Sequence, residues 1–439
     1  MDKQQIISKI KEAGVIGAGG AGFPTHIKLS CSADVVIANG AECEPLLRTD
    51  RLLMEKYPEK VVAGLKAAMC VTDAKRGVIA LKKKYVKAVE AIKGVLESGM
   101  ELHLMDSYYP AGDEQQIVYE VTGKVVPTGG LPIDVGAVVQ NVATLINIAD
   151  ALQGTPVIEK YITVTGEVSD AAVYKAPIGT PLTKLIAAAG GPKDFSEYSV
   201  IIGGPMMGRV SGDISTEVVE KTTGGIIVMP KDHTLIRQKT RGLEQDIKLA
   251  KSVCCQCNYC TQLCPRNALG LKVEPHKIMR ALALNAENFG EVNGILSCCN
   301  CGVCTHYACN FQLSPSKLMT RVKQELTKAG VKPEKKVPFG VADNIESIRV
   351  PVSRLMIRLG IKDYDKDLQL KDELINHDCV CLPLKMHIGA PAVPSVKTGD
   401  NVTAGQMIAS VANGVGANLH ASITGIAMVT DKTIEIRKQ

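Results

Sequence analysis

Two cysteine runs in the second half of the chain constrain its structure more than any other feature. Three thiolates at intervals of three residues, followed by a fourth, are typical of loops that wrap an iron–sulfur cube. Zinc sites more often use two separated Cys-x-x-Cys pairs. The runs therefore predict two [4Fe-4S] clusters, with zinc as the alternative. The first run comprises Cys254, Cys257, Cys260 and Cys264, and the second comprises Cys298, Cys301, Cys304 and Cys309.

In ferredoxins with this spacing, the fourth cysteine of each run ligates the cluster of the other run. The second run departs from the pattern, because it has one extra residue before Cys309 and Asn310 in place of proline. Cys255 and Cys299 lie out of register, and we interpret them as packing residues, with ligand substitution as the alternative. The predicted ligand sets are crossed: Cys254, Cys257, Cys260 and Cys309 for one cluster, and Cys298, Cys301, Cys304 and Cys264 for the other.

The bulk composition limits the classes of protein that remain. A chain of 439 residues exceeds one compact core and should divide into about three or four domains. The cysteines in cluster spacing and the lack of a recognisable signal peptide predict a cytoplasmic protein without disulfides. No apolar run approaches the roughly 18–20 residues that span a bilayer. The net charge of +6 is modest, and the chain has no Trp and five Phe, which disfavours nucleic-acid binding.

The N-terminal third combines a glycine-rich loop with alternating strands and helices. Apolar spacing predicts a helix over 6–13, and the segment Gly17-Ala-Gly-Gly-Ala-Gly-Phe-Pro comes after it. The GxGxxG pattern in this loop is not a Rossmann turn, because a helix precedes it and a proline interrupts the segment after it. Buried strands over 33–38 and 76–81 and a helix over 86–96 indicate a layered α/β domain.

Three more polar loops, over 39–45, 108–115 and 140–145, follow strands or begin helices. Backbone N–H groups at such places are free to bind a phosphate or a ribityl chain. The glycine loop offers the same donors, and Lys28 is a possible charge partner. The four loops together predict a site for a flat or phosphorylated ligand, although the glycine loop alone could be a tight solvent loop.

These four loops resemble the flavin domain shared by the flavin subunit of respiratory complex I and the C subunit of the Rnf complex. The resemblance covers residues 1 to about 150 and implies that the loops hold FMN, with NADH stacking over the flavin. Ala41 stands where complex I has a further acidic residue. Phe23 and Glu44 are the implied NADH contacts. The implied FMN contacts are Gly17, Gly19, Gly20, Gly22, Lys28, Asn39, Glu42, Gly112, Glu114, Asn141 and Thr144.

The rest of the chain divides into four segments. We expect a β-grasp domain like the soluble-ligand-binding (SLBB) domain over 156–230, after the FMN/NADH domain over 1–155; a spacer role for it is at least as plausible as ligand binding. Helical periodicity over 275–289 and 316–326 predicts an α-helical ferredoxin domain over 231–330. A connector over 331–380 carries one helix over 352–359. Gly-Asp turns between short strands predict a barrel-sandwich hybrid over 381–439, which is not lipoylated because no lysine occurs from Gly405 to Asp431.

The whole order resembles the cobalamin reductases of propanediol-utilisation microcompartments. The resemblance is carried by GAGGAGFPTH, NGAECEPLLRTD, YPAGDEQ, GGPMMG and HIGAPAVP. It implies a multidomain α/β and α+β oxidoreductase that passes electrons from NADH to FMN, to the [4Fe-4S] clusters and to cob(III/II)alamin. It also suggests a microcompartment location, with an adenosyltransferase or the shell as partner. No catalytic residue is predicted, because the cofactors carry the chemistry.

Two alternatives remain open. In one, the acceptor is a redox protein and the chain is an electron-transfer adaptor, as in the electron-transfer protein of clostridial proline reductase, which has a similar architecture. In the other, the chain is a docking scaffold whose clusters are structural. No Asp-x-His-x-x-Gly corrin-binding pattern occurs in the sequence.

Overall fold

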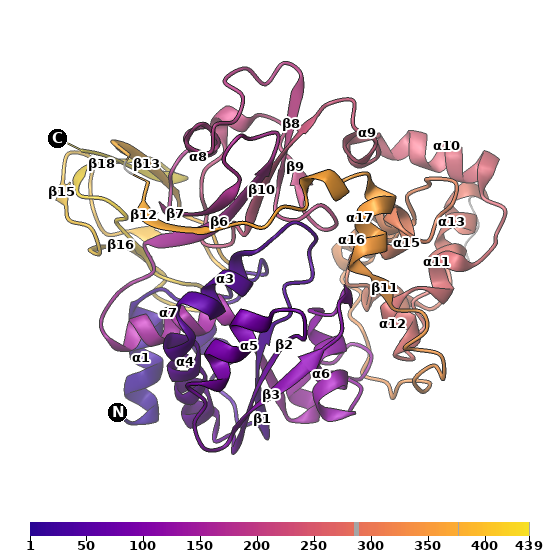
Figure 1. Ribbon diagram of the computed structural model, residues 1–439, viewed down its shortest axis with the longest axis horizontal. Helices are drawn as coiled ribbons and strands as arrows, with labels where there is room; N and C mark the ends of the chain where they lie inside the picture. Colours follow the sequence, from indigo (N-terminus) through magenta and orange to yellow (C-terminus); the bar gives the residue numbers. More distant parts are fainter. Residues whose placement is uncertain (285–288, 376, 439) are drawn as a thin grey trace.

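The computed structural model describes residues 1–284, 289–375 and 377–438. Figure 1 shows the N-terminal domain at the bottom, a magenta β domain above it, a helical domain to the right and a yellow β domain to the left. This multidomain arrangement of α/β and α+β units agrees with the predicted fold class. Within the described ranges, no helix is both long enough and apolar enough to cross a membrane.

A four-stranded parallel sheet forms the centre of the N-terminal domain, in the strand order β3-β2-β1-β5. Val36 and Ala38 pack into the core on one face, while Val35 and Ile37 pack into the core on the other. Both faces are therefore buried, as apolar strand sequences predict. The strands are β1 (Val35–Gly40), β2 (Arg76–Lys82), β3 (Met100–Met105) and β5 (Ala137–Asn141).

Helices cover both faces of this sheet. The core around Val36 includes residues of α1 (Lys3–Glu12), α4 (Pro58–Thr72), α5 (Val86–Lys93) and α7 (Val142–Leu152), and the core around Val35 includes residues of α6 (Glu114–Thr122). The predicted helix over 86–96 ends at Lys93, where Gly94 caps it. The remaining elements are α2 (Thr25–Lys28), α3 (Thr49–Lys56), β4 (Tyr108–Tyr109) and η1 (Pro132–Val135).

The β-grasp domain contains a six-stranded sheet in the order β12-β7-β6-β10-β8-β9. Helix α8 (Leu182–Ala188) packs its apolar residues against one face of the sheet. Five strands come from the domain itself: β6 (Glu159–Gly166), β7 (Ala172–Pro177), β8 (Tyr198–Ile202), β9 (Arg209–Val210) and β10 (Gly225–Pro230), with η2 (Ile214–Thr216) between the last two.

The sixth strand, β12 (Leu370–Leu374), comes from the segment predicted as a connector and pairs in parallel with β7. The same segment contributes β11 (Val350–Pro351), which pairs with β4 of the N-terminal domain. Its helix α17 (Val352–Leu359) has the predicted bounds, and η3 (Lys362–Tyr364) comes next. The segment thus joins two domains by backbone hydrogen bonds in addition to linking the third and fifth segments of the chain.

The cysteine-rich domain is helical, as predicted. Helix α13 (Pro275–Leu284) covers the first part of the predicted helix over 275–289, and residues 285–288 lie outside the described residues. Short helices follow the cysteines of each run. The other helices are α9 (Thr234–Thr240), α10 (Leu243–Val253), α11 (Tyr259–Gln262), α12 (Pro265–Ala268), α14 (Val292–Leu296), α15 (Val303–His306) and α16 (Pro315–Lys328).

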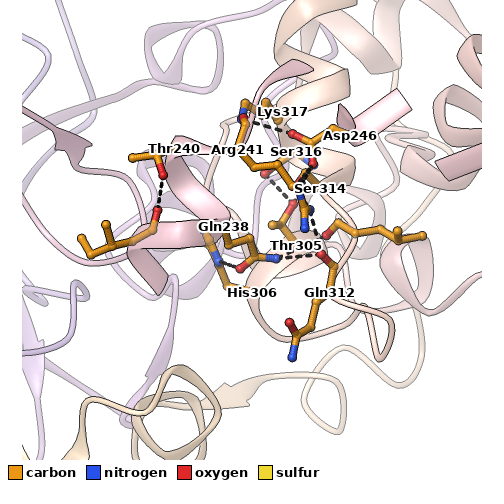
Figure 2. Close-up of polar contacts among 12 residues, drawn as sticks. Gln238, Thr240, Arg241, Asp246, Thr305, His306, Gln312, Ser314, Ser316 and Lys317 are labelled. Carbon is orange, nitrogen blue, oxygen red and sulfur yellow. Dashed lines mark hydrogen bonds and ion pairs between the residues drawn. The ribbon is translucent and has the colours of Figure 1, made fainter. Parts of the chain in front are cut away.

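A buried carboxylate joins α10 to the start of α16 (Figure 2). Asp246 accepts hydrogen bonds from Nε of Arg241 at 2.5 Å and from Oγ of Ser314 at 2.9 Å. Its second oxygen lies 3.1 Å from Nζ of Lys317. Since a buried charge is tolerated only when it is paired and hydrogen-bonded, these contacts hold together the helix before the first cysteine run and the helix after the second run.

The C-terminal domain consists of two small sheets, in agreement with a barrel-sandwich hybrid. Its apolar residues share one core with α1 and α4 of the N-terminal domain. Lys221 of the β-grasp domain is buried and donates to the carbonyl oxygens of Gly14 at 2.7 Å and Asn418 at 2.8 Å, which links three domains. One sheet contains β13 (Cys379–Pro383), β19 (Thr433–Arg437), β18 (Gly425–Val429) and β15 (Asn401–Val402), and the other contains β14 (Val393–Pro394), β16 (Met407–Ser410) and β17 (Leu419–His420).

Helices α4 and α7 cross at Gly64. A Cβ atom at this position would overlap the backbone carbonyl of Leu145. Only glycine therefore allows the two helices to approach this closely, and α7 begins directly after Asn141, one of the predicted FMN contacts.

We predict that Gly64→Ala destabilises the N-terminal domain by about 1–3 kcal/mol, the usual cost of overpacking a core. The matched control is Gly94→Ala, which is also in a right-handed helical conformation and whose Cβ would meet no neighbour closer than 3.5 Å. Thermal denaturation followed by circular dichroism should show a lower first midpoint for Gly64→Ala only. Equal midpoints for the two variants would contradict the close crossing.

Candidate functional site

The predicted flavin loops meet at the carboxyl edge of the parallel sheet. Strands β1 and β5 are neighbours, and Asn39 is the register partner of Asn141 at their carboxyl ends. Ligands of open α/β sheets bind at this edge, and here the helix α7 begins directly after β5. The Asn141 side chain caps that helix by accepting from the Ala143 N–H at 2.9 Å. The structure therefore brings the second and fourth loops together.

The glycine loop lies over the N-terminus of α7. Gly17 donates to the carbonyl of Phe23 at 2.9 Å, which closes the loop. Gly19 and Gly20 at its apex are exposed, and Gly20 has a φ of +113° with open space where a Cβ would be. A Cβ at Gly19 would approach the Asn141 side chain to 3.3 Å. The apex thus leaves backbone groups accessible to a ligand.

Two side chains hold this loop at Ala18. Thr144 Oγ1 accepts the Ala18 N–H at 2.8 Å, and Nζ of Lys160 donates to the Ala18 carbonyl at 3.0 Å. Gly22 has a φ of +67° and lies against Thr222 of the β-grasp domain. Thr144 was predicted from the resemblance, whereas Lys160 belongs to the neighbouring domain and carries no sequence signal for this position.

The third loop joins the other two through hydrogen bonds. Asn39 Nδ2 donates to the Gly112 carbonyl at 2.9 Å, and Lys28 forms an ion pair with Glu114 at 2.6 Å. A Cβ at Gly112 would lie 3.3 Å from Cys43 Sγ, so this position is closely packed. All four loops therefore form one contiguous cluster.

Two carboxyl groups lie inside this cluster. Glu42 accepts the backbone N–H groups of Asp50 at 2.8 Å and Arg51 at 3.2 Å, and Asp50 accepts from Asn141 Nδ2 at 2.7 Å. Burial, together with the nearby Glu42 carboxylate, raises the pKa of Asp50 to about 7. Burial likewise raises the pKa of Glu42. The sequence reasoning identified Glu42 and missed Asp50.

The two predicted NADH contacts are placed differently. Phe23 is half-buried at the base of the glycine loop. Glu44 accepts the backbone N–H groups of Met206 at 2.9 Å and Met207 at 2.8 Å, in the turn between β8 and β9. The Tyr109 hydroxyl lies 3.4 Å from the Glu44 carboxylate. Glu44 thus binds the β-grasp domain in this structure, and its role toward NADH stays a prediction.

The cluster of loops fits a polar ligand. Four buried polar atoms without a hydrogen-bond partner belong to the loops or to residues beside them: Thr25 Oγ1, His26 Nδ1, Gln115 Oε1 and Gln140 Nε2. Buried polar groups in native proteins almost always have a partner. A flavin ring supplies both donors and acceptors of the kind that these groups lack, and a phosphate supplies acceptors.

The cysteines surround two separate cavities, and each cavity draws on both cysteine runs. We call them the Cys264 cavity and the Cys309 cavity, after the cysteine that crosses from the other run. The Cys264 cavity is lined by Cys264, Cys298, Cys299, Cys301 and Cys304. The Cys309 cavity is lined by Cys254, Cys255, Cys257, Cys260 and Cys309. This division corresponds to the predicted crossed ligand sets.

Each set of cysteines lines an open space in this structure. Zinc requires its thiolates about 2.3 Å from one point. Within the described ranges, no group of three or more His, Cys, Asp or Glu side chains is arranged to hold a metal ion. The cysteines instead enclose spaces of about 310 and 360 Å³, open solvent included.

Thiolate charges in these cavities require a positive partner. Burial, together with the neighbouring Cys309 and Cys254, raises the pKa of Cys260 to about 12. Burial also raises the pKa of Cys264, with Cys298 as the next cause. Cluster iron would supply the positive charge that stabilises the thiolates, because metal ligands bind in their deprotonated form.

The two runs share one backbone conformation. In the first run Gln256 and Asn258 have φ values of 58° and 70°, and in the second run Asn300 and Gly302 have values of 55° and 79°. These left-handed residues alternate with cysteines and turn successive backbone N–H groups to one side, an arrangement that binds anions and Fe–S clusters. The first three cysteines of the two runs thus have the same setting, although the second run has an extra residue before Cys309.

The off-register cysteines differ from each other. Cys299 is half-buried, packs with the core that includes Tyr109 and also lines the Cys264 cavity, so its role stays a prediction. Cys255 is exposed, so the packing interpretation is wrong for this residue. Its exposure arises because the Cys309 cavity lies near the surface.

The flavin loops contact the Cys264 cavity directly. Tyr109 donates to the Cys301 carbonyl at 2.7 Å, and Asp113 forms a buried ion pair with Arg266 at 2.6 Å. Gln116 Nε2 donates to the carbonyl of Pro265 at 2.8 Å. The Cys264 cavity is therefore the one adjacent to the flavin site, which the sequence did not indicate.

The Cys309 cavity lies nearer the solvent. Cys257 in its lining is exposed, whereas Cys264, Cys301 and Cys304 are buried. Phe311, also in the lining, is 49% exposed. The arrangement thus runs from the flavin loops through a buried cavity to a cavity at the surface.

Family models match four parts of the chain. The Nuo51 FMN-binding domain matches residues 10–150, and the SLBB domain matches 161–210. The 4Fe-4S dicluster domain matches 253–314, and the RnfC barrel sandwich hybrid domain matches 360–437. The chain is thus a flavo-iron–sulfur protein with FMN and two [4Fe-4S] clusters as cofactors.

Curated relatives resemble the chain over its full length. Cobalamin reductase PduS of Citrobacter freundii is 39% identical, covering 99% of this chain and 97% of the relative. PduS of Salmonella typhimurium is 38% identical over the same shares. The C subunit of the Na(+)-translocating ferredoxin:NAD(+) oxidoreductase complex of Acetobacterium woodii is 37% identical, covering 60% of this chain and 58% of that relative. The chain is an electron-transfer oxidoreductase, and it belongs to the cobalamin reductase PduS family.

Proposed function

We propose that the chain is an NADH-dependent reductase that passes electrons through FMN and two [4Fe-4S] clusters to cob(III/II)alamin. The contact of the flavin loops with the Cys264 cavity carries the proposal, because it joins the two kinds of cofactor site through three hydrogen-bonded contacts. The full-length similarity to relatives named cobalamin reductase supports corrin cobalt as the acceptor.

The protein holds and separates the cofactors. When bound, FMN accepts two electrons from a nicotinamide, and each iron–sulfur cluster carries one. The glycine loop, the N-terminus of α7 and the Lys28–Glu114 pair would hold FMN, and the crossed cysteine sets would hold the clusters. Phe23 and Glu44 would contact NADH. No side chain has to act as a general acid or base in hydride transfer.

We also propose the domain bounds that the sequence predicts, which are 1–155, 156–230, 231–330, 331–380 and 381–439. The segment from Val350 to Leu374 holds the flavin and β-grasp domains together, because its strand β11 pairs with β4 of the first and its strand β12 pairs with β7 of the second. We further propose that the protein works in the cytoplasm inside a bacterial microcompartment, beside an adenosyltransferase or the shell.

A second candidate function is an adaptor that reduces a protein partner. Three exposed apolar residues of the ferredoxin domain favour it: Phe311, in the lining of the Cys309 cavity, and Tyr259 and Val253, each next to a cysteine of that lining, with exposed fractions of 49%, 48% and 38%. Exposed apolar groups at an electron exit suit a protein surface.

Anaerobic NADH addition separates the two functions. We predict that NADH bleaches the flavin and cluster absorption of the purified protein and that cob(III)alamin added alone is then reduced. Bleaching without corrin reduction until a partner protein is added would support the adaptor instead. Protein that carries clusters but does not respond to NADH would contradict both functions.

Single cysteine substitutions should affect the two cavities unequally. We predict that Cys304→Ser, in the cavity adjacent to the flavin site, leaves flavin reduction by NADH intact and abolishes electron paramagnetic resonance (EPR) signals from NADH-reduced clusters. Cys260→Ser should preserve the signal of one NADH-reduced cluster and slow acceptor reduction. Cys70→Ser on the exposed face of α4 is the control and should change neither. Equal loss of NADH-driven cluster reduction in both variants would contradict the order of the cavities.

A further inference from the structure

We propose that Arg266 is a positioning residue that raises the reduction potential of the cluster in the Cys264 cavity, and that Asp113 of the flavin loop opposes this effect. The inference deepens the proposed function and rests on it for the direction of electron flow. Its test measures an equilibrium potential, so it can stand or fall separately from NADH oxidation and corrin reduction.

Arg266 lies in the wall of the Cys264 cavity. It follows Cys264 and Pro265 directly and lines the cavity together with Cys298 and Cys299. Its exposed fraction is 9%. A cation at this depth interacts with a cluster through protein and not through water, which strengthens the interaction several-fold.

The Arg266 guanidinium has a hydrogen-bond donor that lacks a partner. One terminal nitrogen forms the 2.6 Å ion pair with Asp113, while the buried Nε has no hydrogen-bond partner. A guanidinium carries five N–H donors and no acceptor. Cluster sulfides and cysteine thiolates are the acceptors available in a filled cavity, so the Nε–H group is suited to bind one of them.

Charge and hydrogen bonds act on the potential in the same direction. Reduction adds one negative charge to a cluster, and a nearby cation or an N–H donor stabilises the reduced form. The Asp113 carboxylate neutralises part of the Arg266 charge and therefore lowers the potential again. Because Asp113 stands between Gly112 and Glu114, this balance is set within the flavin loop itself.

The two cavities differ in whether a basic residue lines them. The described residues that line the Cys309 cavity include Gln256 and His276 but no Lys or Arg. Substitution of Arg266 should therefore shift one cluster only. Lys323 offers a matched comparison, since it donates to the Cys298 carbonyl at 2.7 Å, is partly exposed and does not line the Cys264 cavity.

The test is potentiometry of the holoprotein with EPR detection of each reduced cluster. We expect Arg266→Gln to lower the midpoint potential of one cluster and Asp113→Asn to raise that of the same cluster. A ten-fold fall in the ratio of reduced to oxidised cluster at fixed potential corresponds to a shift of about 59 mV. Asparagine can still cap α6, which isolates the charge effect. Lys323→Gln should give a smaller shift than Arg266→Gln.

Iron and flavin content, measured for each variant, ensure that only fully loaded protein is compared. The inference is overturned if fully loaded Arg266→Gln protein keeps both midpoints, if both clusters shift equally, or if Arg266→Gln and Asp113→Asn shift the same cluster in one direction. Opposite shifts at one cluster support it even where the protein fails to reduce cob(III)alamin, in which case the proposed function alone is rejected.

Discussion

The structure depends on the contact between the Tyr108–Gln116 segment and the cysteine loops. Three interactions make it: Tyr109 with the Cys301 carbonyl, Asp113 with Arg266, and Gln116 with the Pro265 carbonyl. Each interaction involves a polar group that is buried or nearly buried. If one partner is removed, the other is left without a hydrogen bond, and its desolvation is then an uncompensated cost to stability. The flavin site and one cluster cavity are therefore held in a fixed relation, although they lie in different domains.

The β-grasp domain also helps to fix the flavin site relative to the cluster cavity, because it contacts both the flavin domain and the ferredoxin domain. Its turn between β8 and β9 donates two N–H groups to Glu44 of the flavin domain. Lys239 of the ferredoxin domain donates to the carbonyls of Met206 and Gly208 in this turn at 3.0 and 2.7 Å. A spacer role therefore explains the GGPMMG motif: its turn binds both neighbouring domains and needs no ligand. A Cβ at Gly204 would overlap the Glu44 side chain as it is placed here.

Local patterns predicted much of this arrangement. Cysteine spacing indicated two clusters and crossed ligands because the ligands of a cube lie within a few residues of one another in each run. Strand and helix patterns placed β1, β2 and α17 to within two residues of their ends. The helix over 86–96 ended early at Gly94, a cap that the apolar periodicity does not encode.

Contacts between distant segments could not be predicted in this way. Asp113 and Arg266 are 153 residues apart, and Lys160 reaches Ala18 across 142 residues. Neither pair leaves a periodic or spacing signal in one sequence. The strand β12 was hidden for a related reason: Leu370–Leu374 is polar and mostly exposed, as an edge strand can be, and only its pairing with β7 defines it.

The central claim is that one cluster lies in a cavity of crossed cysteines against the flavin loops. An anomalous-difference map at the iron absorption edge, from crystals of anaerobically purified protein, tests it most directly. The account predicts two separate iron peaks, one enclosed by Cys264, Cys298, Cys301 and Cys304 beside the Asp113–Arg266 pair, and one enclosed by Cys254, Cys257, Cys260 and Cys309 near the surface. Two results would contradict the account. One is iron held by four cysteines of a single run. The other is an iron peak beside the flavin loops that is enclosed by Cys254, Cys257, Cys260 and Cys309.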